Sequence, residues 1–461
     1  MNAQAVLTAM MPEHLLLLGI VGLLGLEIVG RWQRYALALA LVAVGAAAVA
    51  AAILSFGGYA AAPFAGHFSV DPATLLAKAV VLALTLPVLM MSRGEFKGGE
   101  FPALLLSSLY GACLMQSADS FLTLFLGMEI LSMPVYVLVL LAYRRPQSAE
   151  AALKYLVLGG VSTAMFLMGV SLLYGGSASM DITVLAQALG TGDAMARAAV
   201  VLVLLAFFLK GAIVPFHTWA PDAYEASSVP VTAYMAVIVK AAVLLAAVRL
   251  IGPAELATPM LELVVVLPLV SIVWGNLAAM RQPSLRRMMA YSSIAHAGYL
   301  FYALLGAPEG RLQAVVFYLL AYGLLNLLAF AALPPAADDG ERDLLANLKG
   351  LFHRAPFAAL MIGIAMLSLA GIPPFPGFVA KFLIFKNVVA AGYTTYAVLG
   401  LVGSYLGIYF YLRVIQFMFM SPDAPVADAG KVRNWAWTAT VACLAATLIV
   451  AVFPGWVLAQ F

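Results

Sequence analysis

The chain has 461 residues, of which 64% are hydrophobic and only 10% are charged, and its mean hydropathy is +1.03. This composition excludes an ordinary soluble domain and indicates an integral membrane protein. A formal net charge of +3 provides no basic field for nucleic acid, and the two cysteines, Cys113 and Cys443, are too few for a disulfide framework or a four-thiolate iron–sulfur site.

Apolar segments long enough to cross a bilayer recur along the whole chain. A hydrocarbon core about 30 Å thick needs about 20 apolar residues per helix, and lipid favours helices because their backbone groups are satisfied internally. We therefore predict an all-α integral membrane protein with about 14 transmembrane helices. The predicted spans are 12–30, 35–54, 72–92, 101–117, 119–142, 150–174, 197–228, 229–250, 262–280, 288–306, 312–332, 356–391, 394–420 and 432–458.

Basic residues are distributed unevenly over the predicted loops. Loops after odd-numbered spans contain Arg31, Arg34, Arg93, Lys97, Arg144, Arg145, Arg281, Arg286, Arg287, Arg342, Lys349, Arg354, Lys431 and Arg433. Loops after even-numbered spans contain only Arg197, Arg249 and Arg311. The positive-inside rule therefore places the odd loops in the cytoplasm and both termini on the outer side of the membrane. In the longest cytoplasmic loop, 338–356, leucines at helical spacing predict an interfacial amphipathic helix.

Four ionisable residues from different spans fall near the bilayer midplane. At about 1.5 Å per helical residue from the nearest loop, Glu129 lies about 15 Å deep, Lys210 about 20 Å, and Lys240 and His296 about 14 Å. Charge at this depth is expensive and typically marks an ion pathway. A neutral histidine can instead be satisfied by one hydroxyl, so a structural role for His296 stays open.

The other intramembrane charges have simpler alternatives. Lys154 lies nearer the cytoplasmic side and has Glu150 four residues earlier, so it can reach the interface or pair locally. Lys78, Lys386 and Arg413 can also reach a membrane interface, and Glu27 can pair with a neighbouring helix or subunit. The sequence assigns no role to these four residues.

Two predicted spans are interrupted by proline. Pro215 follows Lys210 by five residues, and Pro376 precedes Lys381 by five residues. Irregular backbone at membrane depth is buried in protein or lines water, and paired interruptions indicate a transport site between internal repeats. Because the two lysines are 171 residues apart, spans 4–8 and 9–13 are predicted to be two five-helix repeats. An odd number of helices gives consecutive copies opposite topology.

The segments that carry these residues resemble the subunit N family of bacterial proton-pumping NADH–quinone oxidoreductase (complex I). They are LFLGMEILSMPVYVLV (124–139), EAALKYLVLGGVSTAMFLMGVSLLYG (150–175), FFLKGAIVPFHTWAPDAYEASSVPVTAYMAVIVKAA (207–242), GNLAAMRQPSLRRMMAYSSIAHAGYL (275–300) and LSLAGIPPFPGFVAKFLIF (367–385). The resemblance covers essentially the whole chain and is most specific over 120–420. It implies an antiporter-like, proton-translocating subunit with a polar axis along the bilayer midplane.

The resemblance also implies roles for individual residues. Glu129 is implied to be a charge-switching acid that influences Lys210, Lys240 to be a central relay, and Lys381 to be the terminal lysine. Lys154 belongs to the family's polar set, and His296 is expected to be a stepping stone between the lysines. The chain then divides into an N-terminal three-helix segment (1–100), two antiporter-like repeats (101–250 and 251–420) and a C-terminal transmembrane helix (421–461).

Location, partners and cofactors are also implied by the resemblance. We expect a bacterial inner-membrane subunit that contacts lipid and other membrane-arm subunits, especially antiporter-like ones, and that binds no nucleic acid. Redox chemistry, flavin, iron–sulfur clusters and quinone are expected in other subunits, and this chain is expected to contain no cofactor or metal. The alternatives are a subunit of a cation/proton antiporter or of a related membrane-bound hydrogenase complex, and a membrane anchor whose polar axis no longer conducts.

Overall fold

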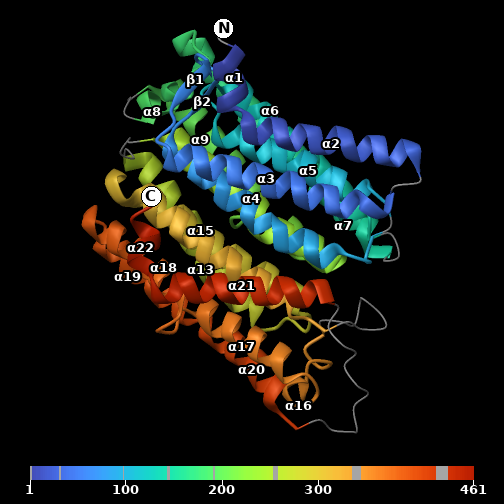
Figure 1. Ribbon diagram of the computed structural model, residues 1–461. Helices are drawn as coiled ribbons and strands as arrows, with labels where there is room; N and C mark the ends of the chain where they lie inside the picture. Colours follow the sequence, from blue (N-terminus) through green and yellow to red (C-terminus); the bar gives the residue numbers. More distant parts are fainter. Residues whose placement is uncertain are drawn as a thin grey trace.

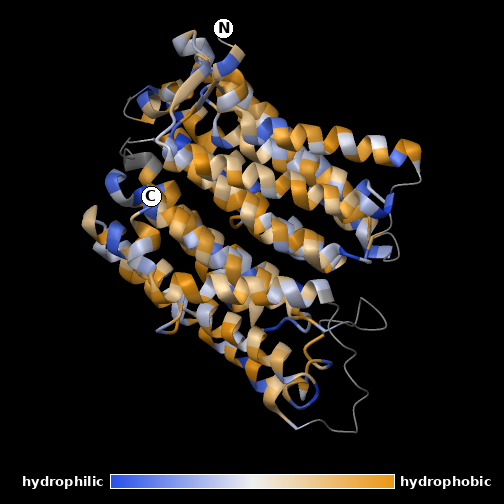
Figure 2. Cartoon of the chain, in the orientation of Figure 1, coloured by the Kyte–Doolittle hydropathy of each residue, from blue (hydrophilic) through white to orange (hydrophobic). Residues whose placement is uncertain are grey.

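Long helices lie side by side through the whole molecule (Figure 1). The computed structural model describes residues 3–30, 33–96, 98–142, 146–189, 193–252, 258–334, 344–421 and 434–460, with side chains described for these except at 258–260 and 434. Hydrophobic residues cover the long helices, and hydrophilic residues gather at helix ends and connections (Figure 2). The helices at residues 11–56 lie at one end of the bundle, and those at residues 351–370 and 408–419 lie at the opposite end (Figure 1).

The first half of the chain forms one end and the centre of the bundle. Its elements are α1 (Ala3–Ala9), α2 (Met11–Val29), η1 (Gln33–Tyr35), α3 (Ala36–Phe56), β1 (Ala61–Phe64), β2 (Phe68–Val70), α4 (Pro72–Ser92), α5 (Glu100–Gln116), α6 (Phe121–Leu140), α7 (Pro146–Ser177), α8 (Thr183–Leu189), α9 (Ala194–Lys210), α10 (Trp219–Ala226), α11 (Val229–Tyr234), η2 (Met235–Val239) and α12 (Lys240–Ile251). The element η2 is a π-helical turn that runs directly into Lys240.

The second half completes the bundle. Its elements are α13 (Thr258–Ala279), α14 (Leu285–Tyr302), η3 (Ala303–Leu305), α15 (Pro308–Ala331), α16 (Leu351–Arg354), α17 (Pro356–Ala370), α18 (Pro376–Ala390), α19 (Thr394–Tyr405), α20 (Ile408–Phe419), α21 (Asn434–Val452) and α22 (Pro454–Leu458). Helices α14 and α15 are buried along most of their length, so they form the interior against which both halves pack.

Among the described residues, ten helices are long and apolar enough to cross a membrane. The prediction of a helical, multi-pass membrane protein is therefore confirmed. Four further predicted spans coincide with shorter or more polar elements: α5, which has 17 residues, α14, and the pairs α9–α10 and α17–α18. Of the 14 basic residues in the loops after odd-numbered spans, seven lie outside the described residues, namely Arg31, Lys97, Arg144, Arg145, Arg342, Lys431 and Arg433.

Both predicted interruptions are present in the structure. Helix α9 ends at Lys210, and α10 begins at Trp219; Pro215 lies in the irregular segment between them, where it has no N–H to donate to a helix. Helix α17 ends before Gly371, which has φ +86°, and α18 begins at Pro376. Helices α17 and α18 pack closely at this break, because a Cβ atom on Gly377 would lie 1.9 Å from the carbonyl oxygen of Ser368.

The amphipathic helix predicted for residues 338–356 is wrong for the described part of that segment. Residues 338–343 lie outside the described residues, and within the described part of the loop, 344–355, the only helix is the four-residue α16. The leucines at helical spacing are buried against protein: Leu345 is 2% exposed and Leu351 is not exposed. Gly350 has φ +71° and donates its N–H to the carbonyl of Phe417 at 3.0 Å, so the segment is tied to α20 and cannot continue as one helix.

A small β-hairpin, which the all-α prediction did not include, joins α3 to α4. Strands β1 and β2 are antiparallel, with Ala61 opposite Val70, and Gly66 takes φ +74° in the turn. The N–H of Ser69 donates to the carbonyl of Ser117 at 3.1 Å. The hairpin therefore packs on the connection between α5 and α6.

Candidate functional site

Helices α6 and α9 bring Glu129 and Lys210 together. The lysine Nζ lies 3.8 Å from Oε1 of Glu129, and the two side chains are 3% and 19% exposed for Lys210 and Glu129, respectively. Lys210 donates a hydrogen bond to Ser132 Oγ at 2.8 Å, and Thr163 Oγ1 donates to Glu129 Oε1 at 2.5 Å. Each charge thus has a neutral hydroxyl partner as well as its counter-charge.

Ser132 holds the lysine one turn along α6 from the carboxylate. Its own hydroxyl donates to the backbone carbonyl of Met128 at 2.7 Å, so its oxygen is oriented to accept from Lys210. The spacing of three residues between Glu129 and Ser132 places both on one helix face. Lys210 is the last residue of α9, so its side chain lies where the helix ends and the irregular segment begins.

Lys240 lies at the first position of α12, directly after the π-helical turn η2. It is 3% exposed, and its ammonium group donates to the backbone carbonyl of Ser293 on α14. The Ser293 hydroxyl is 3.2 Å from the hydroxyl of Tyr224 on α10. Among the described residues, no carboxylate lies within ion-pair distance of Lys240. A π-helical turn beside a polar residue is common at functional sites.

His296 is held by two tyrosine hydroxyls. Its Nδ1 is 2.7 Å from Tyr318 Oη, and its Nε2 is 3.1 Å from Tyr411 Oη. The hydroxyl of Ser292 lies 2.5 Å from the same Tyr411 oxygen. Because one ring nitrogen of a neutral imidazole donates and the other accepts, this arrangement can pass a proton from one side of the ring to the other.

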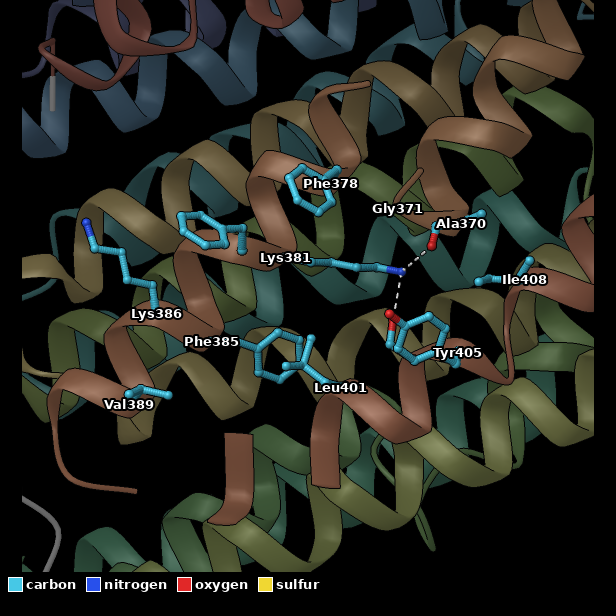
Figure 3. Close-up of a pocket in the computed structure, with 12 residues that line it drawn as sticks. Ala370, Gly371, Phe378, Lys381, Phe385, Lys386, Val389, Leu401, Tyr405 and Ile408 are labelled. Carbon is cyan, nitrogen blue, oxygen red and sulfur yellow. Dashed lines mark hydrogen bonds between the residues drawn. The ribbon is translucent and has the colours of Figure 1, made fainter. Parts of the chain in front are cut away.

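Lys381 points toward the break between α17 and α18 (Figure 3). Its Nζ donates to the carbonyl of Ala370 at 3.1 Å and to Ser404 Oγ at 3.0 Å. The ring of Tyr299 lies 5.1 Å from the same nitrogen. Lys381 also lines a cavity of about 370 Å³ whose walls include Gly371 and Phe385. Both hydrogen-bond partners of the ammonium group, Ala370 and Ser404, line the same cavity.

One helix, α14, links three of these residues. Its Ser293 carbonyl contacts Lys240, its His296 contacts the two tyrosines, and its Tyr299 ring contacts Lys381. His296 and Tyr299 rings lie 5.5 Å apart. The structure therefore joins Lys240, His296 and Lys381 into one polar row, with Lys210 and Glu129 as a separate pair. Among the described side chains, no direct hydrogen bond joins Lys210 to Lys240.

Lys154 lies apart from the buried set. Its side chain is 45% exposed and forms ion pairs of 2.7 Å with Glu150 and with Asp222 on α10. Asp222 also pairs with Arg287 of α14 at 3.0 Å. The expected local pairing with Glu150 is present, and the structure adds a bridge across three helices that the sequence did not reveal.

The four unassigned charges have separate surroundings. Lys78 is fully buried and paired with Glu13 at 2.6 Å, so the interpretation that it reaches an interface is wrong. Glu27 accepts from the N–H of Gly99 at 3.0 Å, at the start of α5. Arg413 donates to the carbonyl of Met280 at 2.7 Å, just after α13. Lys386 is exposed and lines the cavity beside Lys381.

Sequence reasoning missed the hydroxyl groups that hold the site together. These are Ser132, Thr163, Ser292, Ser404, Tyr318 and Tyr411. Isolated hydroxyls are frequent in membrane helices and give no local signal. The exception is α14, where Ser292, His296 and Tyr299 are spaced by four and three residues and so share one helix face.

Comparison with known proteins assigns the family. Residues 118–407 match the family model described as NADH:quinone oxidoreductase/Mrp antiporter, TM. The chain is 38% identical over 451 residues to NADH-quinone oxidoreductase subunit N of Pelobacter propionicus, covering 98% of this chain and 97% of that protein. A chain in the structure of respiratory complex I from Thermus thermophilus with bound aureothin matches with a TM-score of 0.85 and 34% identity, covering 97% of this chain and 98% of that one.

A chain of the Mrp complex from Dietzia sp. DQ12-45-1b matches with a TM-score of 0.84 over 100% of this chain and 96% of that one. Its identity is 21%, so this match shows a shared fold alone. The match to subunit N extends over nearly the whole length of both chains at higher identity. The chain therefore belongs to the NADH:quinone oxidoreductase/Mrp antiporter family and, within it, to the subunit N family of NADH-quinone oxidoreductase.

Proposed function

We propose that this chain moves protons across the membrane as a membrane-arm subunit of NADH–quinone oxidoreductase, driven by redox chemistry in other subunits. The observation that carries the proposal is the pair of Glu129 and Lys210, whose charges lie 3.8 Å apart at the end of a broken helix. Burial disfavours the charged form of a lysine, and a nearby carboxylate favours it. A change at Glu129 therefore makes Lys210 hold or release a proton.

The polar row on α14 provides the further stations. Lys240 receives a proton from the side of Lys210, His296 passes it between its two ring nitrogens, and Lys381 is the last station. Water admitted by the two helix breaks completes the steps that side chains do not bridge, because irregular backbone at membrane depth lines water or protein. This part of the proposal is supported by the contacts of α14 with Lys240 and with Lys381.

Lys154 is assigned a role at the cytoplasmic surface. It is half exposed and connects through Asp222 to Arg287. These pairs link α7, α10 and α14, so the cluster adjoins both the second half of the broken helix and the helix that carries the polar row. We assign Lys154 and its ion-pair partners the collection of protons near the path. Loss of this function should reduce pumping less than loss of a buried lysine.

The proposed topology has 14 spans, with inverted repeats over spans 4–8 and 9–13. In support, each predicted repeat contains one interrupted helix with a buried lysine at the break, at α9–α10 and at α17–α18. The proposed division is an N-terminal segment at 1–100, repeats at 101–250 and 251–420, and a final helix at 421–461. Both termini are proposed to lie on the outer side of the bacterial inner membrane.

We propose that flavin, iron–sulfur clusters and quinone belong to other subunits, and that this chain has no redox cofactor. Its partners are then other membrane-arm subunits, particularly antiporter-like ones. Large apolar side chains exposed on the surface, such as Phe382 and Tyr405 beside the Lys381 cavity, suit contact with lipid or with such subunits.

The test is proton pumping by the assembled complex with Lys210→Ala. We expect assembled complex with strongly reduced pumping. A membrane anchor that no longer conducts predicts full pumping by this variant. A cation/proton antiporter, whose fold the Mrp match supports, predicts transport by the isolated chain that depends on Na⁺ or K⁺. Transport measurements with each cation therefore separate the alternatives.

A further inference from the structure

Two hydroxyl groups contact Glu129 and Lys210 more closely than the two charges contact each other. Nζ of Lys210 lies 3.8 Å from Oε1 of Glu129, whereas a direct hydrogen bond from an ammonium group to a carboxylate is about 2.7–2.9 Å long. Lys210 donates instead to Ser132 Oγ at 2.8 Å, and Oε1 of Glu129 accepts from Thr163 Oγ1 at 2.5 Å. The ion pair is therefore open, and a neutral hydroxyl is in direct contact with each charge.

Ser132 acts on Lys210 as an acceptor. Its hydroxyl proton goes to the Met128 carbonyl at 2.7 Å, so the Ser132 oxygen keeps its lone pairs for the ammonium group. Ser132 and Glu129 are three residues apart on one face of α6. They therefore offer the same ammonium group two acceptors, one neutral and one charged.

Thr163 contacts Glu129 from a different helix, α7, and close packing fixes its place there. One turn earlier, a Cβ atom on Gly159 would lie 1.9 Å from the hydroxyl of Tyr136 on α6, so the two helices approach closely at this level. Thr163 Oγ1 also lies 3.1 Å from the Gly159 carbonyl oxygen. The hydroxyl is thus anchored to the backbone of α7 while it contacts Oε1 of Glu129.

We propose that Thr163 and Ser132 are positioning residues, which hold the Glu129 carboxylate and the Lys210 ammonium group apart so that Lys210 can release its proton. The inference rests on the proposed proton-translocating function. Without the Thr163 hydroxyl, Oε1 loses its partner on α7 and moves to Lys210 to form a direct ion pair. Because the attraction of two charges increases as their distance falls, the closed pair holds the proton of Lys210 more tightly.

The first test is Thr163→Val in the intact complex, reconstituted into vesicles, because valine keeps the branched shape and lacks the hydroxyl. At an effective dielectric constant of about 20, contraction from 3.8 Å to about 2.8 Å strengthens the attraction enough to slow release of the proton roughly tenfold. Glu129 is 19% exposed, and water at its carboxylate makes this an upper limit. We expect assembled complex in which quinone reduction coupled to pumping is slower, by up to roughly tenfold.

Two neighbouring variants separate positioning from packing. Thr163→Ser keeps the hydroxyl and should run at the wild-type rate. Ser162→Ala is the matched control, because the Ser162 hydroxyl is buried beside Thr163 and donates to the Ala206 carbonyl on α9 at 2.8 Å; each assembled complex should run normally. A wild-type rate for Thr163→Val overturns the proposal, and so does equal slowing by Thr163→Ser or by Ser162→Ala.

Two further measurements ask whether the hydroxyls act through the ion pair. In a Glu129→Gln background, no carboxylate is left to close on Lys210, so Thr163→Val should add no further loss, as expected for residues that act as one unit. An added loss in this background identifies a packing role and contradicts the proposal. Ser132→Ala removes the other hydroxyl and gives an independent answer if Thr163→Val does not assemble: it should also slow quinone reduction, and a wild-type rate again overturns the proposal.

Lys210→Ala, measured in the same vesicles, separates this inference from the proposed function. Normal pumping by Lys210→Ala contradicts proton translocation through the lysine row. Loss of pumping by Lys210→Ala together with wild-type rates for Thr163→Val and Ser132→Ala leaves the row in place and removes only the positioning role of the hydroxyls.

Discussion

Replacing Glu129 with glutamine removes the charge next to Lys210 and little else. Glutamine preserves the size of the side chain, and its amide oxygen can still accept from Thr163. At the observed 3.8 Å, the interaction of two unit charges at an effective dielectric constant of about 20 is worth about 4 kcal/mol. Water at the partly exposed carboxylate lowers this figure. The substitution therefore withdraws up to about 4 kcal/mol of stabilisation from the charged form of Lys210.

We expect Glu129→Gln to assemble and to pump poorly, with quinone reduction slowed because it is coupled to pumping. Assembly is measured separately, because removal of one partner of a buried pair can itself destabilise by roughly 3–5 kcal/mol. The double variant with Lys210→Ala should be little worse than either single variant, since the two residues act as one unit. Glu100→Gln, at an exposed carboxylate at the start of α5, is the matched control and should pump normally. Normal pumping by well-assembled Glu129→Gln refutes the switch.

Three further predictions concern other parts of the chain. Lys154→Ala should reduce pumping less than Lys210→Ala, because the Lys154 side chain is 45% exposed; equal losses in assembled complexes would show that exposure does not rank these lysines. Gly377→Ala should reduce the amount of assembled complex, because its Cβ atom would lie 1.9 Å from the Ser368 carbonyl oxygen, whereas Gly363→Ala, with nothing within 4 Å, should assemble normally; equal yields would contradict the close packing at this break. The purified chain should contain no flavin, haem or iron–sulfur cluster. A measured content of about one iron or one flavin per chain would contradict the assignment of the redox cofactors to other subunits.

Features that depend on local sequence could be predicted well. Apolar length located the helices, because a bilayer requires a minimum run of apolar residues. Proline marked the two breaks, because Pro215 and Pro376 cannot donate to a helix ladder. Depth along each span predicted a common level for Lys240 and His296, and in the structure Lys240 donates to the Ser293 carbonyl of α14, the helix that carries His296.

Features that depend on contacts between distant segments could not be predicted. The partner of Lys78 is 65 residues away in the sequence, and nothing near either residue indicates the other. The same holds for Tyr411, which is 115 residues from His296. In the loop at 344–356, helical spacing of leucines misled the prediction, because the spacing does not distinguish burial against protein from burial in lipid, and Gly350 breaks the helix.

The central claim is that Lys210 carries a proton that it takes up and releases, and the most direct test is the number of protons pumped per NADH oxidised by the reconstituted complex with Lys210→Arg. Arginine keeps a positive charge beside Glu129 but does not release a proton in proteins. We predict that Lys210→Arg assembles and still fails to pump, like Lys210→Ala. Pumping at the wild-type ratio by Lys210→Arg would contradict the account and make Glu129 and Lys210 a structural ion pair.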